Sequence, residues 1–114
     1  MSRSKLQDDV ISTLERMGLP CSREWVTEDG LFSVDILAEL PGGRRVAVEV
    51  DGPSHFTRTR PYTQLGATRL RNRLLRVRVP RMVQVPYYEW NDLKSKGERE
   101  AYLKELIGRA GGDE

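Results

Sequence analysis

The sequence has one cysteine and one histidine among 114 residues, which excludes several kinds of site. Cys21 cannot form an internal disulfide. One cysteine and one histidine, His55, are too few ligands for a zinc finger or a similar His/Cys site. No apolar run approaches the roughly 18 residues that a membrane-spanning helix needs, so no membrane partner is expected. The first residues do not resemble a secretory signal, and we expect that any targeting segment is absent from this sequence.

Acidic residues are missing from a long internal stretch. Between Gly52 and Tyr88 there is no aspartate or glutamate, whereas this stretch holds eight arginines and no lysine. Its charge of +8 leaves −6 for the other residues, because the net charge is +2. Guanidinium groups pair with phosphate through two hydrogen bonds and stack on bases, so the stretch favours a polyanionic partner. The alternative is a charged helix face that only keeps the chain soluble, and this pattern leaves both open.

Length and apolar periodicity indicate one α/β domain. Hydrophobic residues make up 38% and charged residues 32% of the chain, as in a globular protein with a polar surface. Helices are predicted over 4–17, 62–76 and 98–107, strands over 22–26, 31–40, 44–50 and 82–86, and a turn over 87–91. The order α-β-β-β-α-β-α predicts a sandwich with a mixed sheet. Leucines at 65, 70, 74 and 75 predict the inner face of the second helix.

The loop Pro41-Gly42-Gly43 predicts the register of a hairpin. A three-residue loop places Leu40 opposite Arg44. The other predicted pairs are Ala38 with Val46, Ile36 with Val48, Asp35 with Glu49, Val34 with Val50 and Ser33 with Asp51. This register places the apolar partners on one sheet face, and a slip of one residue would mix the faces.

Asp35, Glu49 and Asp51 are predicted to cluster on one face of this hairpin. Carboxylates directly opposite each other repel, and a divalent cation such as Mg²⁺ between them would relieve the repulsion. Such a metal could orient water for attack on a phosphodiester. Two alternatives stay open at this point: the acids are solvated, or they pair with an arginine of the following helix, for which Arg69 and Arg73 are the candidates.

Several motifs resemble the RAP domain, a family whose name refers to RNA binding and to its abundance in apicomplexans. They begin with Ser-Val-Asp-Ile-Leu over 33–37 and Val-Ala-Val-Glu-Val-Asp-Gly-Pro-Ser-His-Phe over 46–56. Leu-Gly-Ala-Thr over 65–68, Arg-Leu-Leu over 73–75 and Val-Pro-Tyr-Tyr-Glu-Trp over 85–90 follow in order. The likeness runs from about Asp35 to Leu106. It departs over 77–81, where members usually carry a Gly-Trp type of turn.

The resemblance implies a fold and a cellular setting. RAP domains have a restriction-endonuclease-like αβββαβ(α) fold of the PD-(D/E)XK kind, closest to the very-short-patch-repair enzymes. They usually end long mitochondrial or chloroplast proteins, behind helical repeats. They act in RNA processing, RNA stability and ribosomal RNA maturation. Residues 1–114 are therefore expected to be a single C-terminal domain excised from a longer protein, with the upstream repeats and RNA as partners.

The residues support two functions for such a domain. An RNA-binding module would use Arg58, Arg60, Arg69, Arg73, Arg76 and Tyr87, the RNA being single-stranded or structured. A metal-dependent ribonuclease would use Asp35, Glu49 and Asp51, with His55 as base or ligand, and Mg²⁺ or Mn²⁺ as its only expected cofactor. The lysine of the PD-(D/E)XK motif is replaced by Asp51, which argues against the ordinary nuclease mechanism. Trp90 is expected in the core.

Overall fold

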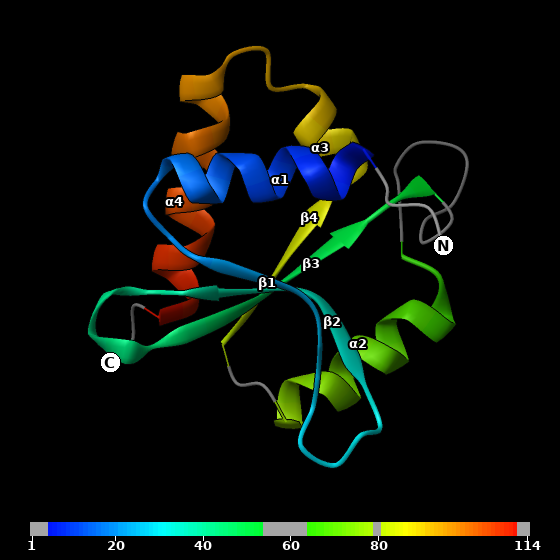
Figure 1. The fold of residues 1–114 in the computed structure, drawn as a ribbon. Helices are drawn as coiled ribbons and strands as arrows, with labels where there is room; N and C mark the ends of the chain where they lie inside the picture. The colour runs from blue at the N-terminus through cyan, green and yellow to red at the C-terminus, as the bar shows by residue number, and fades with distance from the viewer. Residues whose placement is uncertain (1–4, 54–63, 79–80, 112–114) are drawn as a thin grey trace.

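A computed structural model describes residues 5–53, 64–78 and 81–111, except for the side chains of 76–78. The elements within these ranges are α1 (Lys5–Arg16), β1 (Cys21–Val26), β2 (Ser33–Glu39), η1 (Pro41–Gly43), β3 (Arg45–Asp51), α2 (Gly66–Arg78), β4 (Met82–Pro86), α3 (Tyr87–Asn91) and α4 (Lys96–Gly111). Figure 1 shows their arrangement. The predicted α/β order is confirmed. Among these helices, none is long and apolar enough to cross a membrane.

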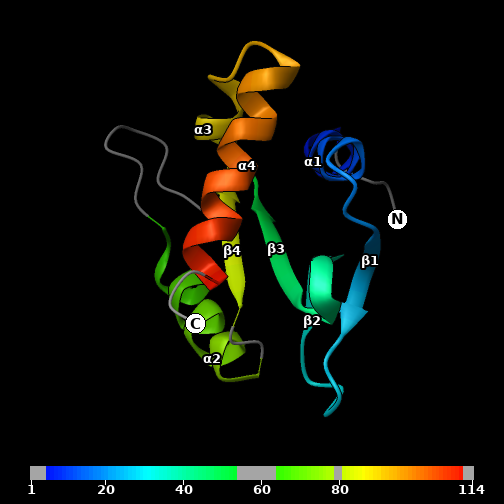
Figure 2. The same ribbon diagram turned by 90° about the vertical axis from the view of Figure 1, so that its left-hand side faces the viewer.

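The sheet is mixed, with the strand order β1-β2-β3-β4. Figure 2 shows the strands from β4 on the left to β1 on the right. The first two pairs are antiparallel, whereas β3 and β4 are parallel. Parallel neighbours need a crossover, and α2 lies within this one. The hairpin register is confirmed at Ile36 with Val48 and Ala38 with Val46, and the Leu40 N–H donates to the Arg44 carbonyl over 2.7 Å.

Helices cover both faces of the sheet. The larger core packs α1, α3 and α4 against one face, through buried residues such as Leu14, Trp90 and Leu103. Figure 1 shows α1 and α4 on this side, away from α2. The smaller core packs Leu75 of α2 against Leu37 and Ala47 on the other face. Trp90 is fully buried, which confirms its predicted place in the core.

The predicted alternation of β2 is wrong at Val34. This side chain packs in the smaller core with Leu75, whereas Ile36 packs in the larger one. Glu24, on the neighbouring strand between the residues that pair with Val34 and Ile36, has a φ of +50°. A left-handed residue inside a strand pair bends the strands locally, and this bend gives a physical reason for the change of face.

The predicted inner face of α2 is wrong for three of its four leucines. Leu65, Leu70 and Leu74 are 43%, 54% and 43% exposed, and only Leu75 is buried. The inward stripe consists of Thr68, Arg71, Asn72 and Leu75, which follow helical spacing. The helix is turned this way because Arg71 reaches an acid buried in the sheet, as described below.

Residues 87–91 form the short helix α3 rather than the predicted turn. Pro86 precedes the helix with a φ of −69° and no side chain caps it. Trp90 anchors it, because its ring is buried against the core and lies 6.1 Å from the ring of Tyr102 in α4. Burial of one large aromatic side chain therefore stabilises a helix whose five residues would not form one alone.

Candidate nucleic-acid interface

The structure brings Asp35 and Glu49 together where the β2–β3 ladder ends. The Asp35 N–H donates to Oε2 of Glu49 over 2.8 Å, and the Val50 N–H donates to Oδ2 of Asp35 over 2.8 Å. Each carboxylate thus accepts a main-chain N–H of the opposite strand. These charge-assisted bonds replace the ladder bonds beyond Ile36 and Val48, and they hold the two strands at a fixed separation.

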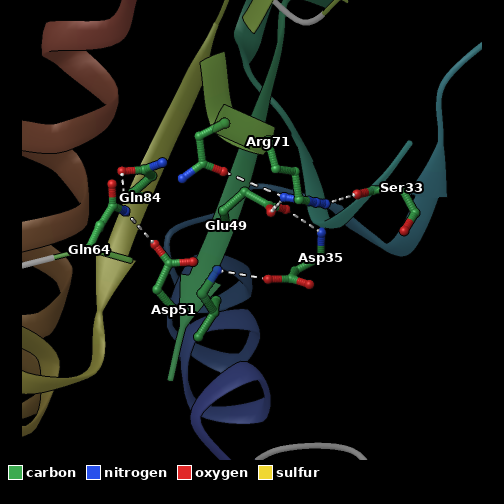
Figure 3. Close-up of polar contacts among 9 residues, drawn as sticks. Ser33, Asp35, Glu49, Asp51, Gln64, Arg71 and Gln84 are labelled. Atoms are coloured by element: carbon green, nitrogen blue, oxygen red, sulfur yellow. Dashed lines mark hydrogen bonds and ion pairs between the residues drawn. The ribbon is translucent and has the colours of Figure 1, made fainter. Parts of the chain in front are cut away.

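Arg71 of α2 holds this acidic pair from the other side. Its Nη1 donates to Oε1 of Glu49 over 2.6 Å, and its Nη2 donates to the Ser33 carbonyl over 2.6 Å. Figure 3 shows Arg71 lying between Glu49 and Ser33. One guanidinium thereby ties α2 to both β2 and β3.

Arg71 was not among the arginines predicted as partners for the acids, which were Arg69 and Arg73. The signal that could have found it is its spacing from Leu75. Residues four apart share one face of a helix, so an arginine one turn before the buried leucine faces the sheet. Glu49 is 3% exposed, so a cation within reach of its carboxylate was to be expected.

The environment of Glu49 opposes its ionisation. Burial is the largest cause that raises its pKa, and the negative charge of Asp35 raises it further. The bond from the Asp35 N–H and the ion pair with Arg71 lower the pKa, but they do not cancel the rise. Glu49 therefore holds its charge at a cost, and the ion pair with Arg71 offsets part of that cost.

Stability should consequently depend on pH through Glu49. The pKa of Glu49 is raised in the folded chain, so protonated Glu49 contributes to stability. This contribution is fully present below the pKa of the unfolded chain, about 4.5, and is lost as pH rises through the pKa of the folded chain. We expect the free energy of unfolding of the wild type to fall relative to that of Glu49→Gln as pH rises from 4.5. Urea denaturation of both proteins across pH measures this difference. A difference that is constant with pH, or that grows in favour of the wild type, would contradict the raised pKa.

Asp51 lies apart from this pair, in a second polar cluster. Nε2 of Gln64 donates to Oδ2 of Asp51 over 3.3 Å and to Oε1 of Gln84 over 3.2 Å, as Figure 3 shows. Asp51 also raises the pKa of Tyr88, after burial and the charge of Glu89. The Gly52-Pro53 turn after Asp51 predicts that this residue lies at an open end of the sheet, and this prediction is wrong because Asp51 is only 3% exposed. Pairing of β4 beside β3 accounts for this burial.

The described carboxylates do not converge on a metal as they are arranged. Across the ranges that the structure describes, no group of three His, Cys, Asp or Glu side chains could hold an ion. Both oxygens of Glu49 accept hydrogen bonds, from Arg71 and from the Asp35 N–H. A Mg²⁺ or Mn²⁺ ion at Glu49 would have to displace Arg71. His55 lies outside the described residues, and its role as base or ligand stays a prediction.

The predicted RNA-binding residues are distributed as follows. Arg69 and Arg73 lie exposed on α2. Tyr87 is half-buried, with its ring 5.5 Å from that of Tyr88 in an edge-to-face contact. Arg76 belongs to α2 by its backbone. Its side chain, and the whole of Arg58 and Arg60, lie outside the described residues.

Comparison with known proteins identifies the family. The sequence model of the RAP domain matches residues 48–106, just over half of the chain. The chain belongs to the RAP-domain family. This RAP domain is 32% identical over 106 residues to the rice (Oryza sativa subsp. japonica) protein named "RAP domain-containing protein, chloroplastic", covering 92% of the chain and 16% of that protein. It is 36% identical over 75 residues to mouse (Mus musculus) "FAST kinase domain-containing protein 4", covering 65% of the chain and 12% of that protein.

The matched range defines which features fall within the RAP domain proper. It begins in β3 at Val48 and ends in α4 at Leu106, so it contains Glu49, Asp51 and the whole of α2. Asp35 precedes it. The ion pair between Glu49 and Arg71 is therefore a contact within the RAP-domain match, whereas Asp35 reaches Glu49 from the strand before it.

Proposed function

We propose that this chain is an RNA-binding module and that the outer face of α2 is its main contact surface. The observation that carries the proposal is the placement of Arg69 and Arg73. Both are exposed on one helix face, about 6 Å apart along its axis, and neither forms an ion pair with any residue that the structure describes. No acidic residue lies between Gly52 and Tyr88 to compete for them. Two guanidinium groups so placed suit neighbouring phosphates of one strand.

The inner face of α2 supports this role by fixing the helix. The contacts of Arg71 with Glu49 and with the Ser33 carbonyl set the rotation of α2 about its axis. That rotation turns Arg69 and Arg73 toward solvent before RNA binds, so less ordering is needed on association. Arg58, Arg60 and Arg76 are proposed to extend the surface, and Tyr87 to stack on an unpaired base.

The family and the relatives support an organellar setting. The rice relative carries the word chloroplastic in its name. We propose a role in chloroplast or mitochondrial RNA processing, RNA stability or ribosomal RNA maturation. Because the chain spans only 16% and 12% of the two relatives, we further propose that it works beside other parts of a longer protein, with helical repeats selecting the RNA sequence.

The alternative is a metal-dependent ribonuclease, which the contact between Asp35 and Glu49 favours. Two neighbouring acidic residues, one of them with a raised pKa, are a feature of many hydrolytic sites. The ion pair of Glu49 with Arg71 weighs against it, because the arginine stands where a cation would be needed. RNA binding therefore accounts for more of the geometry.

A metal titration separates the two functions. We expect that excess Mn²⁺ leaves the melting temperature unchanged. We also expect that a labelled RNA oligonucleotide incubated with the chain and Mn²⁺ is bound but not cleaved. A ligand at a hundredfold excess over its Kd would stabilise the folded state by about 2.7 kcal/mol. A rise in melting temperature together with RNA cleavage, both abolished in Asp35→Ala, would establish the ribonuclease instead.

A further inference from the structure

A groove of about 800 Å³ lies on the sheet face opposite α2. Its walls are the chain after α1, the β2–β3 turn and one side of α4. Met17, Leu19, Leu40 and Ile107 line it, and all four are half-buried against the larger core. The groove is thus an apolar opening at the edge of that core, away from Arg69 and Arg73.

Three of the six α4 residues that line the groove have a small side chain or none. Gly97, Ala101 and Gly108 line the groove from this helix. A Cβ atom built on Gly108 would meet no atom within 4 Å. Small residues leave the helix surface open to close approach by another backbone, as at close-packed helix pairs.

The charged groups around the groove favour an acidic occupant. Arg44 and Lys104 supply positive charge from the β2–β3 turn and from α4. The one acid in the lining, Glu100, is engaged by Arg16, whose Nε lies 3.2 Å from its carboxylate. The lining thus holds two cations against one acid, and carboxylates beside an apolar stripe would complement it.

We propose that the groove binds an amphipathic α-helix of a partner protein whose apolar stripe is flanked by carboxylates. A second copy of this chain is a poor occupant of the groove, for reasons of charge. The helix that this chain could offer is α2, whose exposed Leu70 and Leu74 are accompanied by Arg69 and Arg73. These arginines would meet Arg44 and Lys104. Since the groove and α2 lie on opposite sheet faces, the partner helix and RNA can bind together.

The test uses the full chain and two labelled helical peptides about four turns long, the length of α4. Both carry the same leucine stripe, flanked by glutamates in one and by lysines in the other. We expect the acidic peptide to bind with a micromolar Kd by fluorescence anisotropy, and the basic peptide at least about tenfold more weakly.

Gly108→Leu should weaken binding of the acidic peptide at least about tenfold, because the leucine side chain fills the groove. It should leave the melting temperature unchanged or higher, because leucine is the better helix former. Gly66→Leu is the matched control, since it makes the same change in α2, also with no atom within 4 Å of the new Cβ. Lys104→Glu should also weaken binding, whereas Lys96→Glu, outside the groove lining, should not.

RNA affinity should be unchanged in Gly108→Leu, which keeps this proposal separate from RNA binding by α2. Three results would overturn it: neither peptide binds, Gly108→Leu binds the acidic peptide as the wild type does, or both peptides bind equally. Analytical ultracentrifugation of the chain and of Gly108→Leu tests whether the chain forms a dimer through the groove. A dimer that dissociates in Gly108→Leu would make a second copy the occupant, against the proposal.

Discussion

Reversing two charges on the outer face of α2 is expected to weaken RNA binding about 30- to 150-fold. Arg69→Glu with Arg73→Glu removes two proposed phosphate contacts, and hydrogen bonds to charged groups contribute about 1.5–3 kcal/mol each when well formed. Both side chains are exposed, so we expect about 2–3 kcal/mol in total. Fluorescence anisotropy with a labelled single-stranded RNA, and with its duplex, measures the loss.

The control must change the net charge equally. Lys96→Glu with Arg109→Glu makes the same change on exposed residues of α4. This variant should bind RNA within about threefold of the wild type, because only the long-range field is altered. Neither pair should shift the melting temperature greatly. Equal losses in the two variants would show that total charge, and not the face of α2, governs binding.

Removing Arg71 should have the largest effect on stability. Arg71→Met keeps much of the aliphatic stem but leaves Glu49 buried without its cation. Breaking a fully buried ion pair costs about 3–5 kcal/mol. The Arg71 side chain is 38% exposed, so water reaches the pair, and we expect a loss of about 2–3 kcal/mol in the free energy of unfolding at neutral pH. Urea denaturation provides the measurement.

Two further variants isolate the ion pair from the rest of the helix. Arg73→Met makes the same substitution two residues away at an exposed position and should change stability by less than about 0.5 kcal/mol. The double variant Glu49→Gln with Arg71→Met should recover a large part of the loss, since no unpaired charge stays buried. If Arg71→Met were as stable as Arg73→Met, the ion pair would not hold α2 to the sheet.

The hairpin register could be predicted from the sequence because local rules fix it. The Pro41-Gly42-Gly43 loop and the alternation of Val46, Val48 and Val50 allow one register that keeps apolar residues together. The first two family motifs, over 33–37 and 46–56, also begin in these strands. Trp90 could be placed in the core, although the helix that it anchors was predicted as a turn.

The rotation of α2 could not be predicted, because it depends on a contact distant in sequence. The four leucines of the helix predicted its inner face, and the pattern gave no weight to Arg71. Arg71 nevertheless faces the sheet, because Glu49 lies buried beneath it. Val34 changes face where Glu24, on the neighbouring strand, has a φ of +50°. Such couplings between elements leave no periodic signal. For Glu49 the acidic residue itself was identified, but its partner was not.

The salt dependence of RNA binding tests most directly whether the outer face of α2 contacts phosphates. The logarithm of the binding constant should fall linearly with the logarithm of salt concentration, by about 0.7 for each phosphate contact with a single strand. Neutral replacement, Arg69→Gln with Arg73→Gln, should reduce the slope by about 1.4 if each arginine neutralises one phosphate. An unchanged slope in this variant would contradict the account, because the two arginines would then make no phosphate contacts.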